Sequence, residues 1–377
     1  MSVRVAIIGA GIMGAAAAYS LAKRGADVTL FEQYAKTHER GSSHGATRLF
    51  RKAYFEHPDY VPLLKRAAMG WRDLEKASGE KLFEMCGLLL AGPPDASVIA
   101  GTRRAAKEHG LSLHNISRSE AEKRLFWFNF DANMDVLIEP AAGFIYADRA
   151  RDAFLSGAKA HGARLLCNTS VSGWTMGGAD IEITAAGEKQ KVDRLVATPG
   201  AFAGELDDLC RRYIRPLRKT LFWTSPGDER LTFHSGFLPF GIEEADGRFR
   251  YGLPAIDGDG VKVGEHTGGA PVSSPHDDAP DAAAEARRDM EAYLKRRLPD
   301  LSSAIAKEQS CLYAMSPDGH FIVDVHPDDA RITLAMGFSG HGFKFAPVIG
   351  EALADLALNG ETLPKFDFLK LARFSSQ

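Results

Sequence analysis

The stretch from Arg4 to Glu32 constrains the fold more than any other part of this chain. Val5 to Ile8 form a short apolar run, typical of a parallel strand that is covered on both faces. Gly9, Gly11 and Gly14 follow it in the spacing G-x-G-x-x-G. The first glycine permits a tight turn, the second lets a pyrophosphate approach the backbone, and the third lets a helix pack closely on a strand. The pattern therefore predicts a dinucleotide-binding βαβ unit.

The residues after the glycines complete this unit. Residues 15–23 predict a helix, at whose start the free amides, those of Ile12 and Met13 included, would hold phosphates. Val28 to Phe31 predict the next strand, and Glu32 at its end can accept hydrogen bonds from a ribose. An acid at this position disfavours a 2′-phosphate and therefore NADP. These residues alone leave NAD and FAD open.

Composition excludes several classes of protein. The chain has 377 residues, enough for two domains, and a formal net charge of −3 with 25% charged residues, so nucleic-acid binding is not indicated. The first apolar run is too short for a signal peptide, and no segment approaches the ~18 apolar residues of a membrane helix. We therefore expect a cytoplasmic protein without membrane contact.

Metal and disulfide chemistry are also disfavoured. Cys86, Cys167, Cys210 and Cys311 lie far apart with no C-x-x-C pair, and the twelve histidines show no ligand spacing. The sequence therefore predicts no metal site, and a metal-dependent hydrolase is an unfavoured alternative.

The middle of the chain changes from helical to strand periodicity. Helices are predicted from residue 59, over 96–109, over 148–161, from a cap at Asp281 to 298, and over 346–358. Strands over 171–175, 181–184 and 189–196 form a meander, and those over 216–223, 233–242, 249–253 and 261–266 form a second antiparallel sheet. One face of that sheet would make a reasonable wall for a substrate pocket.

Two returns to the first sheet make the nucleotide domain discontinuous. An apolar strand breaks on glycine at 197–201, and residues 332–358 repeat the strand, glycine turn and helix of the N-terminus. We therefore expect an α/β fold with a Rossmann-type FAD-binding domain and an antiparallel β-sheet catalytic domain. The first would comprise residues 1–80, 145–210 and 310–377, and the second residues 81–144 and 211–309.

Widely separated stretches then need one explanation: GSSHGATRLFR, DGDGVKVGEHT, QSCLYAMSPDGHFIVD and GFSGHGFKF. In these stretches, and in their order, the chain resembles the monomeric sarcosine oxidase family, which includes N-methyltryptophan oxidase, pipecolate oxidase and the fructosyl amino acid oxidases. The resemblance covers nearly the whole chain. It implies an FAD-dependent amine oxidase, and it is the resemblance that selects FAD over NAD.

The resemblance places several residues against the flavin. Cys311 matches the cysteine that the family joins to the flavin through a thioether, a reaction that needs a thiolate, so basic neighbours that lower the thiol pKa are expected. A lone cysteine is otherwise a small buried hydrophobe. His44 and Arg48 match residues that lie at the flavin ring. The remaining cofactor contacts that the resemblance implies are Ser42, Thr47, Val171, Gly340, His341, Gly342, Phe343 and Lys344.

Two cationic side chains match the family's substrate clamp. Arg51 and Lys344 together would hold a substrate carboxylate, since a guanidinium and an ammonium that converge on one anion fix an amino acid in a pocket. Without the resemblance, Arg51 would be an ordinary surface arginine and Lys344 a solvated cap.

A strand in the second sheet carries the remaining catalytic candidates. Lys262 matches the family's oxygen-activating lysine and His266 its active-site histidine, and alternation puts both on one strand face. Tyr251 and Tyr313 match aromatic pocket residues, although composition makes half-buried core equally plausible. We expect residues 233–249 to set the pocket size.

The implied reaction has two halves. A secondary amine loses a hydride to flavin N5, the resulting imine is hydrolysed, and O₂ is reduced to H₂O₂. An N-methyl amino acid of the sarcosine or N-methyltryptophan type is the leading substrate, with a cyclic imino acid or a fructosyl amino acid as alternatives. A dehydrogenase that passes electrons elsewhere and a non-catalytic flavin-binding protein stay open. The expected partners are the small-molecule amine and O₂, and a monomer is expected.

Overall fold

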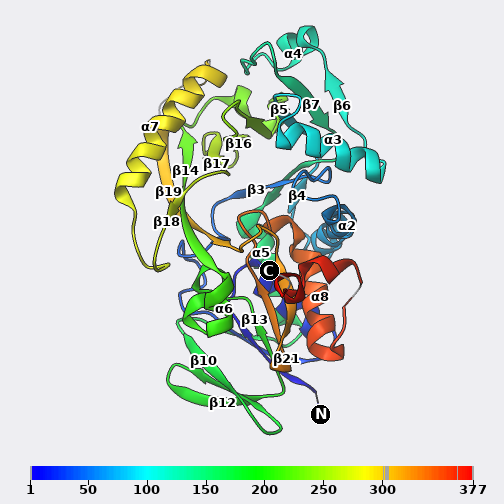
Figure 1. Cartoon of the computed structure of the whole chain (residues 1–377), viewed down its shortest axis with the longest axis vertical. Helices are drawn as coiled ribbons and strands as arrows, with labels where there is room; N and C mark the ends of the chain where they lie inside the picture. The colour runs from blue at the N-terminus through cyan, green and yellow to red at the C-terminus, as the bar shows by residue number, and fades with distance from the viewer. Residues whose placement is uncertain (1, 300, 302–304, 363, 376–377) are drawn as a thin grey trace.

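The fold is organised as two large sheets that meet along the middle of the molecule. The computed structural model describes residues 2–299, 301, 305–362 and 364–375. A six-stranded sheet lies in the lower half of Figure 1 and a nine-stranded sheet in the upper half. None of the helices in the described ranges is long and apolar enough to cross a membrane.

The six-stranded sheet has the first strand of the chain at its centre. β1 pairs in parallel with β2 on one side and with β13 on the other, and β13 pairs in parallel with β21. The order across the sheet is β20 (Ile322–His326), β21 (Asp329–Met336), β13 (Arg194–Ala197), β1 (Arg4–Ile8), β2 (Asp27–Phe31) and β9 (Arg164–Leu166). Strands from three distant parts of the sequence thus share one sheet, and the predicted Rossmann-type, discontinuous fold is confirmed.

Four helices cover this sheet and form one core with it. They are α1 (Ile12–Lys23), α2 (Tyr60–Ser78), α5 (Ala147–Ala160) and α8 (Ala346–Asn359). The alanines at 15–18 of α1 are fully buried, so α1 packs closely on its neighbours. A Cβ at Gly350 of α8 would lie 2.6 Å from the backbone of Ala16, which shows how near the two helices approach. α1 begins at Ile12 rather than at residue 15, because extended Gly11 serves as its N-cap.

The strand predicted over 189–196 is wrong as a single element. It divides at Asp193, whose carboxylate accepts a hydrogen bond from the Arg4 amide at 2.8 Å and whose own amide donates to the Arg4 carbonyl at 3.0 Å. The first part, β12 (Glu188–Val192), stays in a small sheet with β10 (Val171–Met176) and β11 (Ile181–Ala185). The second part is β13, which joins the central sheet.

The nine-stranded sheet carries the other half of the molecule. Its path is β18 (Ala270–Pro271), β14 (Arg215–Thr224), β17 (Lys262–Glu265), β16 (Phe249–Leu253), β15 (Phe240–Glu243), β5 (Leu88–Gly92), β7 (Asp135–Glu139) and β6 (His114–Ile116), with β19 (Ile305–Met315) paired to β14. The sheet is antiparallel except at β15 and β5, which pair in parallel. A smaller sheet of β3 (Thr47–Phe50), β8 (Gly143–Tyr146) and β4 (Phe83–Glu84) lies between the two halves.

The strand predicted over 233–242 is wrong in its first half. Residues 229–231 and 233–235 form 3₁₀ turns, and β15 begins only at Phe240. Asp228 starts the first turn by accepting a hydrogen bond from the Arg230 amide at 3.1 Å. In the second turn, the Ser235 hydroxyl donates to the Glu229 carbonyl at 2.7 Å, and Gly236 ends the turn with a φ of 88°. A local side-chain bond and a left-handed glycine therefore replace the strand pattern in this segment.

Helices α3 (Ser97–His109), α4 (Arg118–Arg124) and α7 (Pro280–Arg297) flank the nine-stranded sheet, and α6 (Asp208–Tyr213) lies beside β14. The predicted cap of α7 at Asp281 is wrong: Ala279 precedes the helix, Pro280 opens it, and Asp281 lies in its first turn. Proline suits this position because the first amide of a helix has no partner within the helix.

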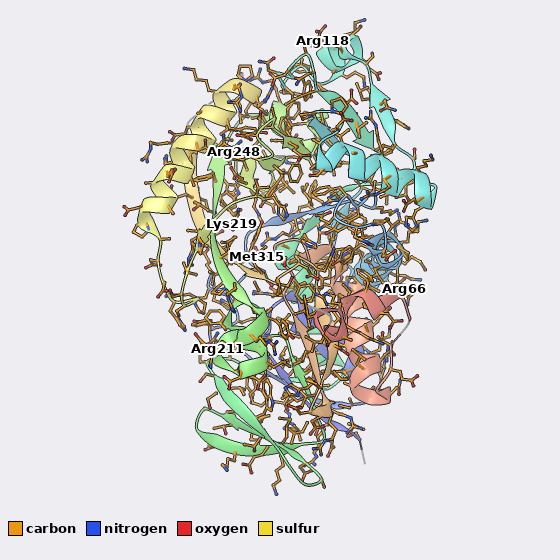
Figure 2. All side chains as sticks on the ribbon, viewed as in Figure 1. Arg66, Arg118, Arg211, Lys219, Arg248 and Met315 are labelled. Atoms are coloured by element: carbon orange, nitrogen blue, oxygen red, sulfur yellow. The ribbon has the colours of Figure 1, made fainter. Side chains whose placement is uncertain are left out.

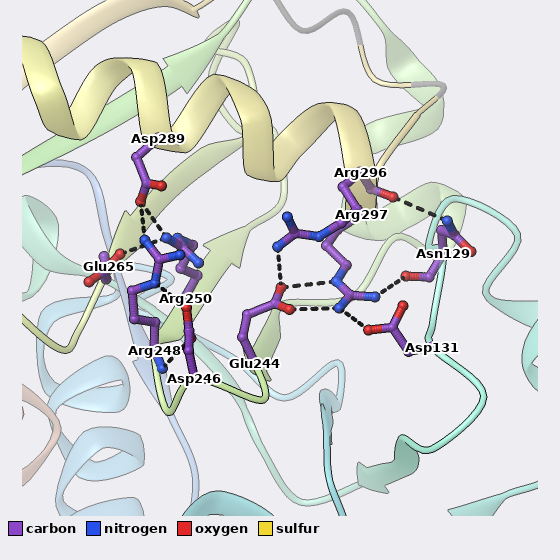
Figure 3. Close-up of polar contacts among 10 residues, drawn as sticks. All are labelled: Asn129, Asp131, Glu244, Asp246, Arg248, Arg250, Glu265, Asp289, Arg296 and Arg297. Atoms are coloured by element: carbon purple, nitrogen blue, oxygen red, sulfur yellow. Dashed lines mark hydrogen bonds and ion pairs between the residues drawn. The ribbon is translucent and has the colours of Figure 1, made fainter.

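An ion-pair network fastens α7 to the sheet (Figure 3). The fully buried Arg297 donates to both oxygens of Glu244, at 2.9 and 2.6 Å, and reaches Asp131 at 2.6 Å. Nearer the N-terminus of α7, Asp289 pairs with Arg248 and with the buried Arg250. The helix is thus fixed at two points, to β16 and to the loops beside β15 and β7.

Arg297→Ala should destabilise the protein by about 3–5 kcal/mol, because it leaves the buried carboxylate of Glu244 without its main partner. Thermal and urea unfolding measure the loss. Arg296→Ala is the matched control: its side chain is 49% exposed and also reaches Glu244, at 3.0 Å, so its removal should cost about 1 kcal/mol or less. Equal losses in the two variants would contradict the assignment of the buried pair as the anchor.

Candidate active site

A single large cavity runs from the glycine turn of β1 and α1 to the face of the nine-stranded sheet. Its volume is about 470 Å³, and its walls include Gly9, Glu32, His44, Cys311 and Lys344. It therefore brings both ends of the predicted site together. Most predicted residues line it; those that do not are Gly14, Thr47 and Lys262, within the part of the chain that the structure describes.

The nucleotide end of the cavity has the shape that the glycines predict. A Cβ at Gly14 would lie 1.9 Å from the Gly9 carbonyl oxygen, so helix and turn leave no room for a side chain there. Glu32 is 6% exposed, and its carboxylate accepts from the amides of Ala10 at 2.9 Å and Tyr34 at 3.0 Å. Burial alone would raise the pKa of Glu32, but hydrogen bonds from His38 and from these amides hold it below its ordinary value. It is therefore an anionic acceptor at the position where a ribose would lie.

Two neighbouring serines have different roles. Ser43, which sequence reasoning missed, accepts a hydrogen bond from the Ile12 amide at 3.0 Å and so lies at the start of α1. Ser42, the predicted contact, donates to the carbonyl of Leu312 on β19. The loop between β2 and β3 is thus tied to the helix start and to the strand that carries Cys311. The sequence alone does not show which of the two adjacent serines bonds to the start of α1 and which bonds to β19.

The loop between β2 and β3 wraps around the Arg48 side chain. Its guanidinium donates to the carbonyls of Gly45 at 2.9 Å, Thr47 at 2.8 Å, Ser42 at 2.9 Å and His44 at 2.6 Å. His44 is 5% exposed, and both of its ring nitrogens are buried without a hydrogen-bond partner. Burial, then the charge of Arg48, lowers the pKa of His44 to about 4, so the ring is neutral at pH 7.

Partnerless ring nitrogens at a cavity wall imply a polar group that normally fills the space. The heteroatom-rich edge of a flavin would supply such a group. Together with the glycine cradle and the acceptor Glu32, His44 shows that this chain's residues fit FAD.

Strand register places the other candidates on one face of the nine-stranded sheet. Gly264 is opposite both Leu221 and Tyr251, and Cys311 is opposite Lys219, so these side chains face the same way. A Cβ at Gly264 would lie 3.0 Å from the Tyr251 hydroxyl. The glycine thus keeps this face flat beside the cavity.

Cys311 is 5% exposed and lines the cavity. The predicted basic neighbours are present, and their charges act to lower the thiol pKa as expected, but burial has the larger effect. Burial raises the pKa of the Cys311 thiol above its ordinary value, and the charges of Arg48, Lys262 and Lys219 only oppose that rise. The thiol is therefore protonated at neutral pH in the chain by itself.

Lys262 points into the backbone of the neighbouring loop and not into the cavity. It is 2% exposed, and its Nζ donates to the carbonyls of Gly45 and Thr47, both at 2.9 Å. Burial, then the charge of Arg48, lowers its pKa well below the ordinary value. The prediction that His266 shares the strand of Lys262 is wrong, because β17 ends at Glu265. The His266 ring nevertheless lines the cavity, 5.8 Å from the Tyr313 ring between centroids.

Arg51 and Lys344 lie at the substrate end, and neither is a surface residue. Arg51 is 4% exposed and Lys344 is 6% exposed. The Nη2 of Arg51 donates to both oxygens of Glu56, at 2.5 and 2.7 Å, while its Nη1 is buried without a partner. Glu56 lines the cavity and was missed, since nothing in the loop after Arg51 distinguishes it from a surface acid.

Lys344 is fixed by the final glycine turn. Its Nζ donates to the His341 carbonyl at 2.7 Å and to the Tyr54 hydroxyl at 3.4 Å. Burial, then the charge of Arg51, lowers the pKa of Lys344 to about 7. Without an anion in the cavity, the Lys344 ammonium therefore loses its proton close to pH 7.

Hydrogen bonds settle the tautomer of His341. Its Nε2 is 2.9 Å from the Gly319 carbonyl, which only accepts, so Nε2 carries the proton. Its Nδ1 then accepts from the Tyr54 hydroxyl at 2.6 Å. A Cβ at Gly340 would lie 2.0 Å from the Tyr313 ring, so this glycine is needed for the turn to pass over that ring.

The expectation that residues 233–249 set the pocket size is mostly wrong. Only Phe249 from that segment lines the cavity. The other wall residues at this end are Leu49, Glu56, Leu221 and those already described. In the described part of the chain, no group of three or more histidine, cysteine, aspartate or glutamate residues is placed to hold a metal ion.

Comparison with known proteins agrees with this geometry. The sequence model of the family described as FAD dependent oxidoreductase matches residues 4–356. The chain is 33% identical over 368 residues to monomeric sarcosine oxidase of Bacillus sp. (strain B-0618), covering 95% of this chain and 93% of that protein. It is 31% identical over 369 residues to N-methyl-L-tryptophan oxidase of Yersinia pestis (strain Pestoides F), covering 98% of both. Among solved structures, L-proline dehydrogenase from P. horikoshii superposes with a TM-score of 0.85 at 23% identity, covering 100% of this chain and 98% of that one.

Gly14→Ala should abolish cofactor binding, because its Cβ would overlap the Gly9 carbonyl and push α1 away from the turn. The measure is the flavin absorbance of the purified protein at equal protein concentration. Gly177→Ala is the control, since a Cβ there meets nothing within 4 Å. A Gly14→Ala protein with full flavin content would contradict the close packing described for this turn.

Proposed function

The chain belongs to the FAD-dependent oxidoreductase family and acts on amine donors, and we propose that its substrate is an N-methyl α-amino acid, with O₂ as the electron acceptor. The observation that carries this proposal is the pair of buried cations, Arg51 and Lys344, at one end of the cavity that holds Cys311. Relatives named for sarcosine and for N-methyl-L-tryptophan support the N-methyl class.

A carboxylate explains this end of the cavity better than an uncharged group does. Nη1 of Arg51 is buried with no acceptor, and an orphaned donor of this kind costs about 1–3 kcal/mol until it finds one. The Lys344 ammonium has a third N–H beyond the two that it donates to His341 and Tyr54. A substrate carboxylate would satisfy both donors.

Glu56 balances the charge while the cavity holds no substrate. Burial would raise the pKa of Glu56, but the charge of Arg51 brings it down to about 2, so the side chain is anionic throughout the physiological range. It already occupies one arm of the Arg51 guanidinium. The substrate carboxylate is then left with Nη1 and Lys344, which restricts where the amino acid can lie.

FAD, when bound, supplies the acceptor for the substrate hydride and passes the electrons on to O₂. His44 would hold the ring edge through its free nitrogens, and the sheet face of Tyr251, Gly264 and Tyr313 would form the opposite wall. Burial lowers the pKa of His266 to about 4, so a neutral imidazole lies near the amine. A neutral neighbour allows the amine to lose its proton before reaction. Positive charge on Arg48, and on Lys262 in its protonated form, would favour the reduction of O₂ beside the cavity.

We further propose that Cys311 binds the flavin covalently. Its thiol lines the cavity, and Arg48, Lys262 and Lys219 each favour the thiolate that the attachment requires. The cationic surroundings thus oppose the effect of burial on this residue.

Other substrates of the same class share the carboxylate. A cyclic imino acid or a fructosyl amino acid would use the same clamp, so the choice among them depends on the space near Phe249 and Leu49. A flavin protein without turnover would have no use for a carboxylate clamp, and Arg51 and Lys344 therefore count against it.

The decisive experiment is a visible spectrum before and after acid precipitation, followed by anaerobic addition of N-methyl, cyclic and fructosyl amino acids. Colour that stays with the pellet in the wild type and in Cys86→Ser, but is released from Cys311→Ser, would support the covalent link. Bleaching by N-methyl amino acids supports the substrate class. A colourless protein that FAD cannot reconstitute would overturn the proposed function.

Arg51→Met and Lys344→Met should each raise KM for the amino acid about 10- to 100-fold, the loss of one charged hydrogen bond. Lys344→Met should leave the poor turnover of the decarboxylated amine unchanged, because that amine makes no use of the clamp. Arg51→Met also leaves Glu56 without its partner, so its effect is read from the ratio of KM for the two amines. Lys52→Met, which alters the neighbouring and less buried lysine, is the control. Unchanged discrimination between the two amines would contradict the clamp.

Anion binding should weaken as the pH rises above about 7, since Lys344 loses its proton in that range and the deprotonated amine cannot pair with a carboxylate. Titration of the flavin spectrum with acetate from pH 6 to 9 avoids the ionisation of a substrate amine. The dissociation constant should rise by up to tenfold per pH unit in the wild type and stay flat in Lys344→Met. A flat wild-type profile would contradict the assigned role.

A further inference from the structure

Lys219 is a buried cation that has no role in the proposed oxidation of the amine, apart from its charge beside Cys311. It is 4% exposed and lies on β14, where Figure 2 shows it between Arg248 and Arg211 along the length of the molecule. Its partner across the ladder is Cys311, so the two side chains share the face of the sheet that holds Leu221. Lys219 nevertheless does not line the cavity.

The ammonium of Lys219 is directed at a turn of the backbone. Its Nζ donates to the carbonyls of three consecutive residues: His266 at 3.3 Å, Thr267 at 2.6 Å and Gly268 at 2.9 Å. A protonated amine has three N–H groups, so the turn uses all of them. A neutral side chain of the same length would leave these carbonyls without that donor.

The glycines of this turn give it little rigidity of their own, and beyond them only the two-residue strand β18 pairs with β14, with Ala270 opposite Arg218. Gly268 and Gly269 have φ values of 63° and 114°, backbone conformations that glycine adopts freely and that hold no shape by themselves. The near side is held by β16, through the His266 amide to the Phe249 carbonyl at 2.8 Å and the Phe249 amide to the Thr267 hydroxyl at 3.0 Å. A Cβ at Gly269 would lie 2.8 Å from Cδ of Lys219, so the turn wraps closely around the lysine.

The residue at the start of the turn faces the cavity. The His266 ring lies 5.8 Å from the Tyr313 ring and 6.3 Å from the His341 ring, between centroids. We infer that Lys219 is a positioning residue, which clamps the turn at 266–268 and thereby holds His266 against the substrate end of the cavity. An unclamped turn would let the ring shift, and a displacement of about 1 Å at a reacting substrate can cost 10²-fold in rate.

The charges around Lys219 are consistent with a clamp. Burial lowers its pKa to about 8, while Glu265 on β17 and Cys311 on β19 act to raise it. The side chain is therefore mostly protonated at neutral pH and keeps three donors for the turn. Its Nζ also lies 5.4 Å from the centre of the Tyr313 ring, whose face favours a cation.

The test compares Lys219→Met with Lys219→Arg, which keeps the charge, and with Arg218→Met. Arg218 is the next residue on β14, points to the opposite face and donates to the carbonyls of Pro275 and Asp277, so it controls for the loss of a cation from this strand. All variants are compared as flavin-loaded proteins. If Lys219→Met does not fold, the test rests on Lys219→Arg. The guanidinium keeps the positive charge but places its N–H donors differently, so it should still loosen the turn at 266–268.

Hydrogen exchange by mass spectrometry is the first readout, and it needs no substrate. Exchange in a peptide that covers residues 262–270 should become at least tenfold faster in Lys219→Met, less so in Lys219→Arg, and not at all in Arg218→Met. Exchange that is unchanged in Lys219→Met, or equally raised in Arg218→Met, would overturn the inference.

Anaerobic bleaching by sarcosine and N-methyltryptophan is the second readout, and only this one rests on the proposed function. The limiting rate of flavin reduction should fall 10- to 100-fold in the Lys219→Met protein that carries acid-stable flavin. Lost flavin attachment with a normal reduction rate would show that Lys219 serves Cys311 instead, and would overturn the inference. Absence of bleaching in the wild type would refute the proposed function, while the exchange data would still decide the role of Lys219.

Discussion

The burial of cations around a single cavity is the constraint on which this structure depends. A charged side chain removed from water needs acceptors inside the protein, or its burial costs several kcal/mol. Backbone carbonyls supply them for Lys219, Lys262 and Lys344, and Glu56 does so for Arg51. The loops at 42–47, 266–268 and 341–344 therefore take their paths around the cations that they enclose. The shape of these loops therefore depends on the buried charges of the site.

The two ends of the cavity are built by different means. At the nucleotide end, neighbouring residues in the sequence make the turn, and close contacts such as Gly14 with Gly9 leave one arrangement. At the other end, strand register does the work: the pairing of β14 with β17 and β19 places residues from three distant segments on one face. The first end takes its turn from local geometry and is closed by Ser43 and Thr198, whereas the second exists only after the whole sheet has formed.

This difference explains what the sequence could predict. The glycine turn and Glu32 follow from local spacing, whereas alternation carried His266 onto the strand of Lys262, which in fact ends at Glu265. Resemblance to a family was needed to single out Cys311, Arg51 and Lys344, since their chemistry depends on neighbours that are remote in sequence. Glu56 and Lys219 escaped because an acid in a loop and a lysine in a strand look like solvated residues until the fold buries them. The strand expected over 233–242 is wrong in its first half because the Ser235 bond to the Glu229 carbonyl and the left-handed Gly236 favour a short turn over a weak apolar pattern.

The contact between α1 and α8 also has a consequence for the path by which this protein folds. The alanine face around Ala16 is covered by Gly350, a residue far away in the sequence. β1 likewise pairs with β13, and β13 with β21, so the central sheet is also built from remote segments. Contacts between remote segments pay loop-closure entropy before packing compensates for it, which slows folding. The sheet and helices that support the cofactor site are therefore completed late in folding.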